Sequence, residues 1–342
     1  MNALSVAIIG AGNIAGGYDE KKLQDAGVYS HAGAYRAHGG FKLNTVYDLD
    51  MQRAQDFCRV WDVTSTLETL AELYAAHHDV ISICTPDKTH FDIVRNILLS
   101  GCCTTVFVEK PLAMGIDQVE EIIELADKSG IHVVVNFQRR NELVHREISE
   151  LIAERPGDLL SVSGHYMKGL RHIGITMIDT LLFLCGYPEA VLTYNRAFNQ
   201  EAGEYSYEFV LYYPGFTANV KTTDADRWHY NYHLFEIDLL FTDMRKTLVD
   251  ISQGIRETSV TPYAYSGVKV MNDRAAGVRD TGYKFSMRDA IEYIHAVTIQ
   301  TKQHIINTPE SFYNNILIIN KVIESFDRGS VKLNFEPIQW KK

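Results

Sequence analysis

Two short motifs in this 342-residue chain contain residue types that could do chemistry. In the first, VAIIGAGNIAG, Gly10, Gly12 and Ala15 follow an apolar run in the order G-x-G-x-x-A. In such a turn the first glycine permits a tight bend, the second lets the backbone approach a pyrophosphate, and the third residue packs closely on the strand. The motif predicts a dinucleotide site, and we expect Asn13 and Ile14 to contact the cofactor. A purely structural glycine turn is the alternative.

The second motif, VFVEKPLAM, ends an apolar run with Glu109, Lys110 and Pro111. A neighbouring run, DVISICTPDKTH, ends in Thr85 and Pro86. Ligands of open parallel sheets bind outside the carboxyl ends of the strands, so these residues should share one edge. There the Lys110 ammonium could hold a substrate hydroxyl, Glu109 could position it, and a cis bond before Pro111 would set the chain direction. The alternative is an exposed ion pair at a strand end.

Asp48, in TVYDLD, follows another apolar run. A carboxylate at the end of the second strand accepts a ribose hydroxyl and repels a phosphate, which predicts NAD rather than NADP. The interval from the glycines exceeds the usual ~20 residues. We attribute this to an insertion in GGYDEKKLQDAGVYSHAGAYRAHGG. A solvated acid at a strand end is the alternative.

The elements that must position these residues follow from hydrophobic periodicity. Up to residue 138, short apolar runs alternate with helix-period segments, the pattern of βαβ units on a parallel sheet. Later runs alternate with period two, which predicts a largely antiparallel sheet. We expect an α/β fold with an N-terminal Rossmann dinucleotide-binding domain (1–138) and a C-terminal α+β domain (139–342) with an open, mostly antiparallel sheet. The expected strands of the first domain are 5–9, 43–47, 79–84, 104–108 and 131–136.

In the second domain we expect helices over 143–154, 172–184, 286–304 and 309–325. The segment 260–282 has no clear period and is expected to be a long loop or arm.

Composition excludes several classes of protein. The chain carries 33 Lys and Arg against 43 Asp and Glu, a net charge of −10, and no long basic run, which argues against binding nucleic acid. No apolar run is long enough to span a bilayer, and the first residues lack the basic region of a signal peptide. Five cysteines without C-x-x-C spacing favour reduced thiols. We therefore expect a cytoplasmic protein with no membrane partner and no metal site.

Four segments, AIIGAGNIAG, DVISICTPDKTHFDIVRNILLSG, VFVEKPLAM and VVVNFQRRN, resemble in order and spacing the glucose-fructose oxidoreductase, inositol dehydrogenase and rhizopine-catabolism (Gfo/Idh/MocA) superfamily. The resemblance covers about the first 140 residues and is looser beyond them. It implies an NAD-dependent oxidoreductase with a Rossmann domain and an open sheet used for substrate binding and for oligomer contacts. The Tyr-rich period-two strands predict a homodimer or homotetramer built on the face of that sheet. By this likeness Lys110 matches the active-site lysine, while Thr85, Pro86 and Glu109 match cofactor-contacting positions. We also place His90 among the cofactor contacts.

The chain departs from the family at its second signature, D-x-G-x-H-x-x-D. Here RHIGITMID has His172 in place of the aspartate and Thr176 in place of the catalytic histidine, while Asp179 is kept. A threonine hydroxyl titrates too high to act as a base and can only exchange hydrogen bonds. We therefore expect Lys110 with His172 to transfer the proton and Thr176 to orient a substrate hydroxyl. A helix-start histidine bonded to backbone is the alternative for His172.

The substrate is expected to be a sugar or nucleotide-sugar, oxidised or reduced at a ring carbon, with C3 as the candidate. Cations near the start and the signature helix of the second domain could hold a phosphate or carboxylate, or could form a solvated rim. They are Arg139, Arg140, Lys168 and Arg171. Arg227, Trp228 and His229 lie beside further aromatic residues, whose faces stack on sugars and bases. The expected substrate contacts are Lys110, Arg139, Lys168, Arg171, His172, Thr176 and Asp179. Two other readings stay open: an NAD-binding sensor without catalysis, and a glycosidase-like enzyme that uses NAD transiently.

Overall fold

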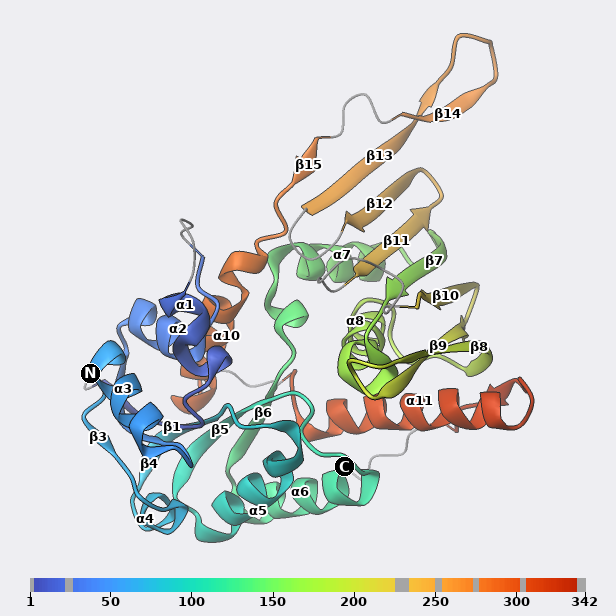
Figure 1. Ribbon diagram of the computed structural model, residues 1–342. Coiled ribbons are helices and arrows are strands. Elements are labelled where there is room, and N and C mark those ends of the chain that lie inside the picture. Colours follow the sequence, from blue (N-terminus) through green and yellow to red (C-terminus); the bar gives the residue numbers. More distant parts are fainter. Residues whose placement is uncertain are drawn as a thin grey trace. The chain divides into compact units, whose positions relative to one another are not determined.

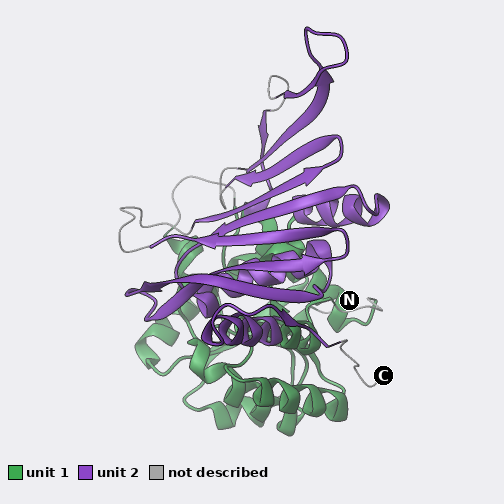
Figure 2. Ribbon diagram, turned by 90° about the vertical axis from the view of Figure 1, so that its right-hand side faces the viewer, with its two compact units in different colours: residues 1–142, 284–314 green, residues 143–283, 315–342 purple. Residues whose placement is uncertain are grey.

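A computed structural model of the chain describes residues 3–21, 27–224, 234–249, 254–272, 277–301 and 306–336. The chain divides into two compact units, coloured separately in Figure 2. Unit 1 comprises residues 1–142 and 284–314, and unit 2 comprises residues 143–283 and 315–342. The expected domain boundary at residue 138 lies near residue 142, where the chain passes from unit 1 to unit 2. Residues 284–314 then belong to unit 1 again. The assignment of cofactor binding and substrate binding to separate domains stays a prediction.

Unit 1 is built on a parallel sheet that has, among the described residues, six strands in the order β3-β2-β1-β4-β5-β6. This is the doubly wound strand order of dinucleotide-binding folds, so the predicted α/β fold class is confirmed. All five expected strands are present, and their apolar runs are continuous because both faces of such a sheet are covered. The strands are β1 (Leu4–Ile9), β2 (Phe41–Tyr47), β3 (Ser65–Thr66), β4 (His78–Ile83), β5 (Cys103–Glu109) and β6 (His132–Asn136).

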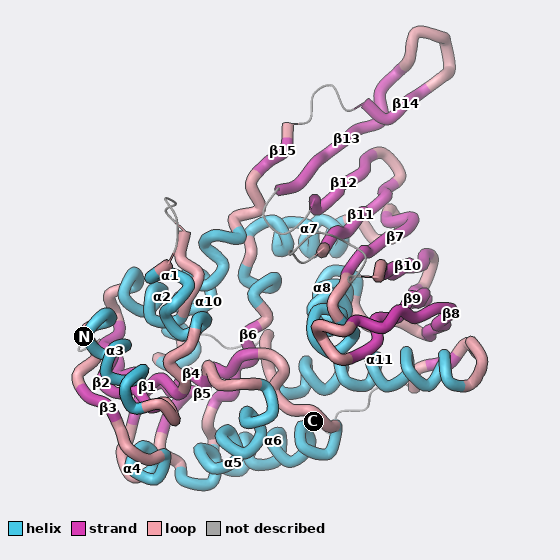
Figure 3. Tube along the Cα trace, viewed as in Figure 1, coloured by secondary structure: helices cyan, strands magenta, loops and turns pink. Residues whose placement is uncertain are grey.

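Helices connect these strands, as Figure 3 shows along the chain. They are η1 (Asn13–Gly17), α1 (Tyr18–Glu20), α2 (His31–His38), α3 (Met51–Trp61), α4 (Leu70–Tyr74), η2 (Asp87–Thr89), α5 (His90–Ser100), α6 (Ile116–Ser129), η3 (Gln138–Asn141) and α10 (Ser286–Thr298). Helix α10 packs against α2, β5 and β6. Its Met287, Ile291 and Ile294 belong to one buried cluster with Val6 and Ile8 of β1. A late segment of the chain thus completes the core of unit 1.

Unit 2 is built on a second sheet with the strand order β14-β13-β12-β11-β7-β10-β9-β8-β16, with β15 paired to β13, among the described residues. Within that part of the chain, the only parallel pair is β7 with β10, so the predicted mostly antiparallel sheet is confirmed. Strand β11 alternates buried and half-buried residues, as expected of a sheet with one covered face. The strands are β7 (Leu159–Tyr166), β8 (Ala190–Asn199), β9 (Glu204–Tyr213), β10 (Phe216–Thr222), β11 (Phe235–Phe241), β12 (Met244–Val249), β13 (Gly254–Pro262), β14 (Lys269–Asn272), β15 (Val278–Arg279) and β16 (Leu333–Asn334).

The helices of this half of the chain are α7 (Leu143–Glu154), η4 (Gly169–Gly174), α8 (Ile175–Cys185), η6 (Tyr283–Phe285) and α11 (Pro309–Asp327). Helix α11 begins in unit 1 and continues into unit 2. The expected helices over 143–154, 286–304 and 309–325 are present, the second of them ending at Thr298 in the described chain.

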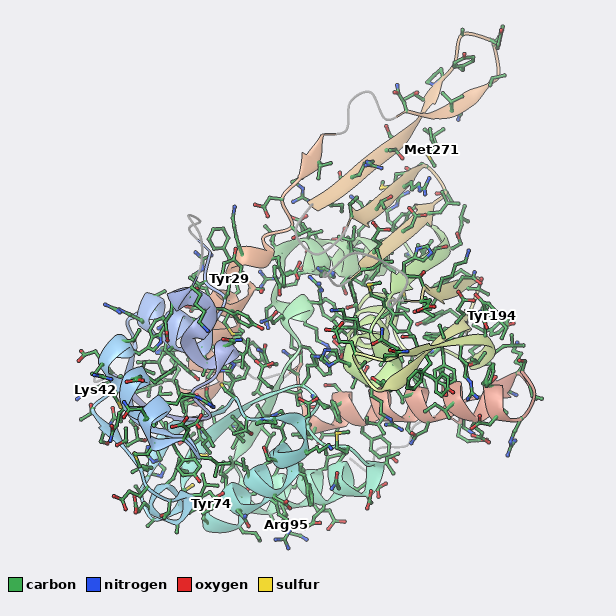
Figure 4. All side chains as sticks on the ribbon, in the orientation of Figure 1. Tyr29, Lys42, Tyr74, Arg95, Tyr194 and Met271 are labelled. Carbon is green, nitrogen blue, oxygen red and sulfur yellow. The ribbon has the colours of Figure 1, made fainter. Side chains whose placement is uncertain are left out.

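Of the long loop or arm expected over 260–282, the structure forms an arm in the first part. Strand β13 continues to Pro262, and β14 pairs with it antiparallel from Ser259↔Asn272 to Pro262↔Lys269, so residues 259–272 form a hairpin arm (Figure 1). Met271, labelled on this arm in Figure 4, is 41% exposed. Because much of the arm is exposed, backbone pairing rather than a buried apolar face defines these strands, and their sequence shows no period.

Candidate functional site

The glycine turn after β1 fits the pyrophosphate of a dinucleotide. Gly10 has a φ of +91°, and a Cβ there would lie 2.8 Å from the carbonyl oxygen of Cys84. The fold itself therefore requires glycine at this position. A Cβ on Gly12, by contrast, would meet nothing within 4 Å, so the turn leaves open space beside its backbone. Asn13, exposed, and Ile14, half-buried, follow on η1 at the same turn.

Asp48 joins the end of β2 to this turn. Its Oδ2 accepts a hydrogen bond from the backbone N–H of Ala11 at 2.8 Å, and its Oδ1 accepts one from that of Asp50 at 2.9 Å. The side chain is only 9% exposed, so it is not a freely solvated acid. An ionised carboxylate can accept further hydrogen bonds, which leaves capacity for ribose hydroxyls. Arg53 lies 3.5 Å away and is a cation that a 2′-phosphate could use.

Strand β5 ends in Glu109, and the Lys110–Pro111 peptide bond is cis, as expected. Glu109 Oε1 accepts hydrogen bonds from His31 Nε2 at 2.8 Å and from Asn136 Nδ2 at 2.6 Å. Its side chain is 15% exposed, so Glu109 does not belong to an exposed ion pair. Lys110 is half-buried.

Glu109 is ionised at neutral pH. Burial alone would raise the pKa of its carboxyl. The hydrogen bond and charge of His31, the Asn136 amide and the charge of Lys110 together outweigh burial and lower the pKa below its ordinary value. A buried negative charge therefore precedes Lys110 directly in the chain.

His90, the first residue of α5, joins the two loops that follow β4 and β5. Its Nδ1 lies 2.6 Å from the carbonyl oxygen of Pro111, and its Nε2 lies 2.8 Å from that of Thr85. The residue has no exposed surface. The sequence predicted that His90 contacts the cofactor. We propose instead that His90 shapes the loops around Thr85 and Pro86.

The signature segment of unit 2 begins differently from the expected helix over 172–184. A π-helical turn, η4, runs to Gly174, and α8 begins at Ile175. Residues four apart across this junction do not follow regular α-helical spacing, so the shared face expected for His172, Thr176 and Asp179 is altered. His172 is exposed and Thr176 half-buried.

Asp179 is 1% exposed, and its Oδ1 accepts a hydrogen bond from Asn315 Nδ2 at 3.0 Å. This burial favours a structural role for Asp179 over its expected contact with substrate.

Glu204 occupies the start of η4. Its carboxylate accepts hydrogen bonds from the backbone N–H of Arg171 at 3.1 Å and of His172 at 2.9 Å. Helix N-termini attract anions, and here the anion is the carboxylate of Glu204.

The cations expected to bind a phosphate have internal partners. Arg139 Nη1 lies 2.5 Å from Glu142, with both side chains almost fully buried. Arg140 donates to the carbonyl oxygen of Ile306 at 2.6 Å. Lys168, only 10% exposed, lies 3.2 Å from Glu201. Arg171 is half-buried, and Arg227, Trp228 and His229 lie outside the described residues. Arg139 and Lys168 are therefore paired with carboxylates and do not belong to a solvated rim.

The predicted site residues fall into two groups. Unit 1 brings the glycine turn, Asp48, Thr85, Glu109 and Lys110 to the carboxyl ends of its strands, and unit 2 holds Lys168, Arg171, His172, Thr176 and Asp179. His31 was not predicted, because it lies in the inserted segment where no motif marks it. Only the helix start, capped by the Ser30 side chain, could have been recognised there.

No described helix is long and apolar enough to cross a membrane. In the described ranges, no cluster of three or more His, Cys, Asp or Glu side chains could hold a metal ion.

Comparison with known proteins identifies the nucleotide-binding half. Residues 4–137 match the model of an oxidoreductase family with an NAD-binding Rossmann fold. D-glucoside 3-dehydrogenase of Escherichia coli is 28% identical over 226 residues, which cover 58% of this chain and 59% of that protein. The match thus spans less than two thirds of that relative's length.

Solved structures share the fold over nearly the whole chain. A putative NADPH-dependent oxidoreductase from Desulfitobacterium hafniense superposes with a TM-score of 0.77 at 18% identity, covering 97% of this chain and 98% of that one. GenD2 from gentamicin A biosynthesis, solved in complex with NAD, superposes with a TM-score of 0.75 at 16% identity, covering 98% and 97%.

Proposed function

The chain belongs to the Gfo/Idh/MocA oxidoreductase superfamily, and on that premise we propose that it is an NAD-dependent dehydrogenase of an uncharged sugar or glycoside. The observation that carries the proposal is the arrangement at the carboxyl end of β5. There a buried, ionised Glu109 precedes the half-buried Lys110. The charge of Lys110 lowers the pKa of this fixed carboxylate, and an amine in such a charge environment is suited to binding and orienting a substrate hydroxyl.

In the proposed reaction, Lys110, His172 and Thr176 have different roles. Bound NAD supplies the acceptor for a hydride from the sugar ring carbon. Lys110 holds the hydroxyl oxygen, and the exposed His172 takes part in proton transfer, because imidazole titrates near neutrality. Thr176 exchanges a hydrogen bond with a neighbouring hydroxyl. Oxidation of an alcohol needs such a proton acceptor as well as a hydride acceptor.

The charge pairing favours an uncharged substrate over a nucleotide-sugar. Arg139 and Lys168 are already neutralised by Glu142 and Glu201, and the start of η4 is already occupied by Glu204. A substrate phosphate would have to displace a carboxylate from these groups, whereas a free sugar or glycoside would not. The name of the E. coli relative, a D-glucoside 3-dehydrogenase, supports ring C3 as the position of oxidation.

We also propose NAD over NADP, because the Asp48 carboxylate lies where a 2′-phosphate would be placed. The similar structures do not decide this, since one is described as NADPH-dependent and the other contains NAD. A cytoplasmic location agrees with five free cysteines. A homodimer or homotetramer stays a prediction.

A sensor without catalysis is the second candidate, and Thr176 favours it because the family's catalytic histidine is replaced. The ionised Glu109 beside Lys110 counts against it, since a sensor needs no such group.

One assay separates these readings. The protein is incubated with NAD and a panel of free sugars, methyl glycosides and nucleotide-linked sugars, and reduced nicotinamide is measured. We expect turnover with neutral members, a loss of about 100-fold or more in Lys110→Ala, and no loss in Lys128→Ala, an exposed lysine on α6. Tight NADH binding without turnover would support the sensor. Glycoside cleavage without net NADH would support the glycosidase-like enzyme, and preference for nucleotide-sugars would overturn the proposed substrate class.

A further inference from the structure

His31 lies in a buried hydrogen-bonded chain beneath the Glu109 and Lys110 motif. It begins α2, has no exposed surface, and its ring centroid lies 4.7 Å from that of Phe107. Its Nε2 is 2.8 Å from Glu109 Oε1, and its Nδ1 is 3.2 Å from Ser82 Oγ. The Ser82 hydroxyl in turn lies 2.7 Å from the Tyr35 hydroxyl. The chain therefore runs Tyr35, Ser82, His31, Glu109.

The direction of one hydrogen bond in this chain follows from its chemistry. An ionised carboxylate only accepts hydrogen bonds, so the His31 nitrogen that faces Glu109 must carry a proton. Asn136 Nδ2 supplies a second donor to the same oxygen at 2.6 Å. Two donors from different elements, α2 and β6, thus fix the carboxylate that precedes Lys110.

This series of hydrogen bonds is suited to positioning the Glu109 carboxylate rather than to carrying protons away. Its far end, Tyr35, is fully buried, and burial raises the pKa of the phenol, so it stays neutral. Cys84, the other titratable group near Glu109, is also buried, and burial followed by the charge of Glu109 raises its pKa well above the ordinary value. His31 and Lys110 are the titratable side chains that lower the pKa of Glu109. A proton that entered the chain from Glu109 would find no exposed acceptor at its end.

We propose that His31 is a positioning residue for the reaction, which holds the Glu109 carboxylate through its Nε2–H and thereby sets the charge environment of Lys110. This inference rests on the function proposed above, in which Lys110 handles the substrate hydroxyl. Removing the His31 donor leaves Glu109 buried with one donor fewer, which favours its neutral form. Lys110 then loses the adjacent negative charge.

The reactivity of Lys110 tests the proposal without turnover. Wild type, His31→Gln, His31→Asn and Tyr35→Phe are labelled with trace acetic anhydride, and acetylation of Lys110 relative to the exposed Lys128 is measured by mass spectrometry. Glutamine places its amide near the Nε2 position, whereas asparagine reaches only the Nδ1 position. We expect His31→Asn to raise Lys110 labelling about threefold or more, because the ammonium is no longer favoured. His31→Gln and Tyr35→Phe should stay within about twofold of wild type.

With a sugar from the panel, the pH dependence of kcat gives a second readout. In His31→Asn the acid limb should move to higher pH, because the Glu109 carboxyl is harder to ionise. The value of kcat should fall about tenfold, with KM for NAD within about twofold. His31→Gln should recover most of the loss. Wild-type labelling and a wild-type pH profile in His31→Asn would overturn the proposal.

An NMR measurement that leaves His31 in place covers the case in which the His31 variants do not fold. Histidine-selective NMR shows which ring nitrogen of His31 is protonated in wild type and in Glu109→Gln. A proton on Nε2 whose signal shifts in Glu109→Gln is the expected result, and a ring protonated at Nδ1 alone would refute the hydrogen bond. If wild type oxidises no sugar, the proposed function fails, but labelling and NMR still decide the role of His31.

Discussion

The Asp48 carboxylate accepts a hydrogen bond from the backbone N–H of Ala11, 2.8 Å away. The end of β2 is thereby joined to the glycine turn that follows β1, although 37 residues separate the two in sequence. Arg53 lies 3.5 Å from the same carboxylate. A negative and a positive side chain therefore lie together at the position where dinucleotide-binding folds distinguish NAD from NADP.

Replacing Asp48 by Ser should weaken the preference for NAD. The variant loses charge-assisted hydrogen bonds and leaves Arg53 to attract a 2′-phosphate, so we expect KM for NAD to rise about tenfold and NADP to become a substrate. Steady-state kinetics with both cofactors measure this. The double variant Asp48→Ser/Arg53→Ala should lose the gain with NADP, and an Asp48→Ser enzyme that still prefers NAD fully would exclude Asp48 from cofactor selection.

Two glycines of the cofactor turn should respond differently to alanine. A methyl group on Gly12 meets no protein atom within 4 Å, whereas one on Gly16 would collide with Trp61 and lie 2.7 Å from Phe57. We expect Gly12→Ala to keep wild-type stability but to bind NADH about tenfold or more weakly, since the methyl occupies ligand space. Gly16→Ala should lose about 1–3 kcal/mol of unfolding free energy by overpacking.

Urea unfolding of both glycine variants measures the free energy of unfolding, and fluorescence titration with NADH measures the affinity for the cofactor. If Gly12→Ala binds NADH as wild type does, the pyrophosphate does not lie against that turn.

His172→Ala should lower kcat about 100-fold and alter the acid limb of its pH dependence, because an imidazole near neutrality would be lost from proton transfer. His165, half-buried on β7 of the same unit, provides the matched control, and His165→Ala should leave both quantities unchanged. The kcat profile is measured with the best sugar of the panel. An unchanged profile in His172→Ala would remove that residue from the mechanism.

Glu109 should make the stability of unit 1 depend on pH. Its pKa in the folded chain is below its ordinary value of 4.5, so its stabilising effect is fully present above that value. The effect is lost as the pH falls through the lowered pKa. We expect the free energy of unfolding to fall more steeply below pH 4.5 in wild type than in Glu109→Gln. Urea titrations at about pH 3 to 6 measure the two slopes.

The control for this pH experiment is Glu124→Gln, which changes an exposed acid on α6 and should keep the wild-type slope. Equal slopes in wild type and Glu109→Gln would show that the ionised carboxylate does not stabilise the fold.

Much of the fold and part of the site could be predicted because each depends on residues close in sequence. The apolar runs specified five strands of unit 1. The spacing of the glycines specified the turn after β1, and the structure has open space beside Gly12 of that turn. An arm was expected over 260–282, but its strand pairing was not, because the exposed and half-buried residues there carry no hydrophobic period. The π-helical turn before α8 was missed because its residue types also suit an α-helix.

By itself, then, the sequence determined the strand and helix types, the dinucleotide turn and the Glu109 and Lys110 motif. The tertiary structure alone decided which charges meet. His31 and Glu109 are 78 residues apart, and Lys168 and Glu201 are 33 apart. Helix α10 joins the core of unit 1 from the far end of the chain. Local patterns arise from neighbours within a few positions, whereas these pairings exist only after the chain has folded back and buried both partners.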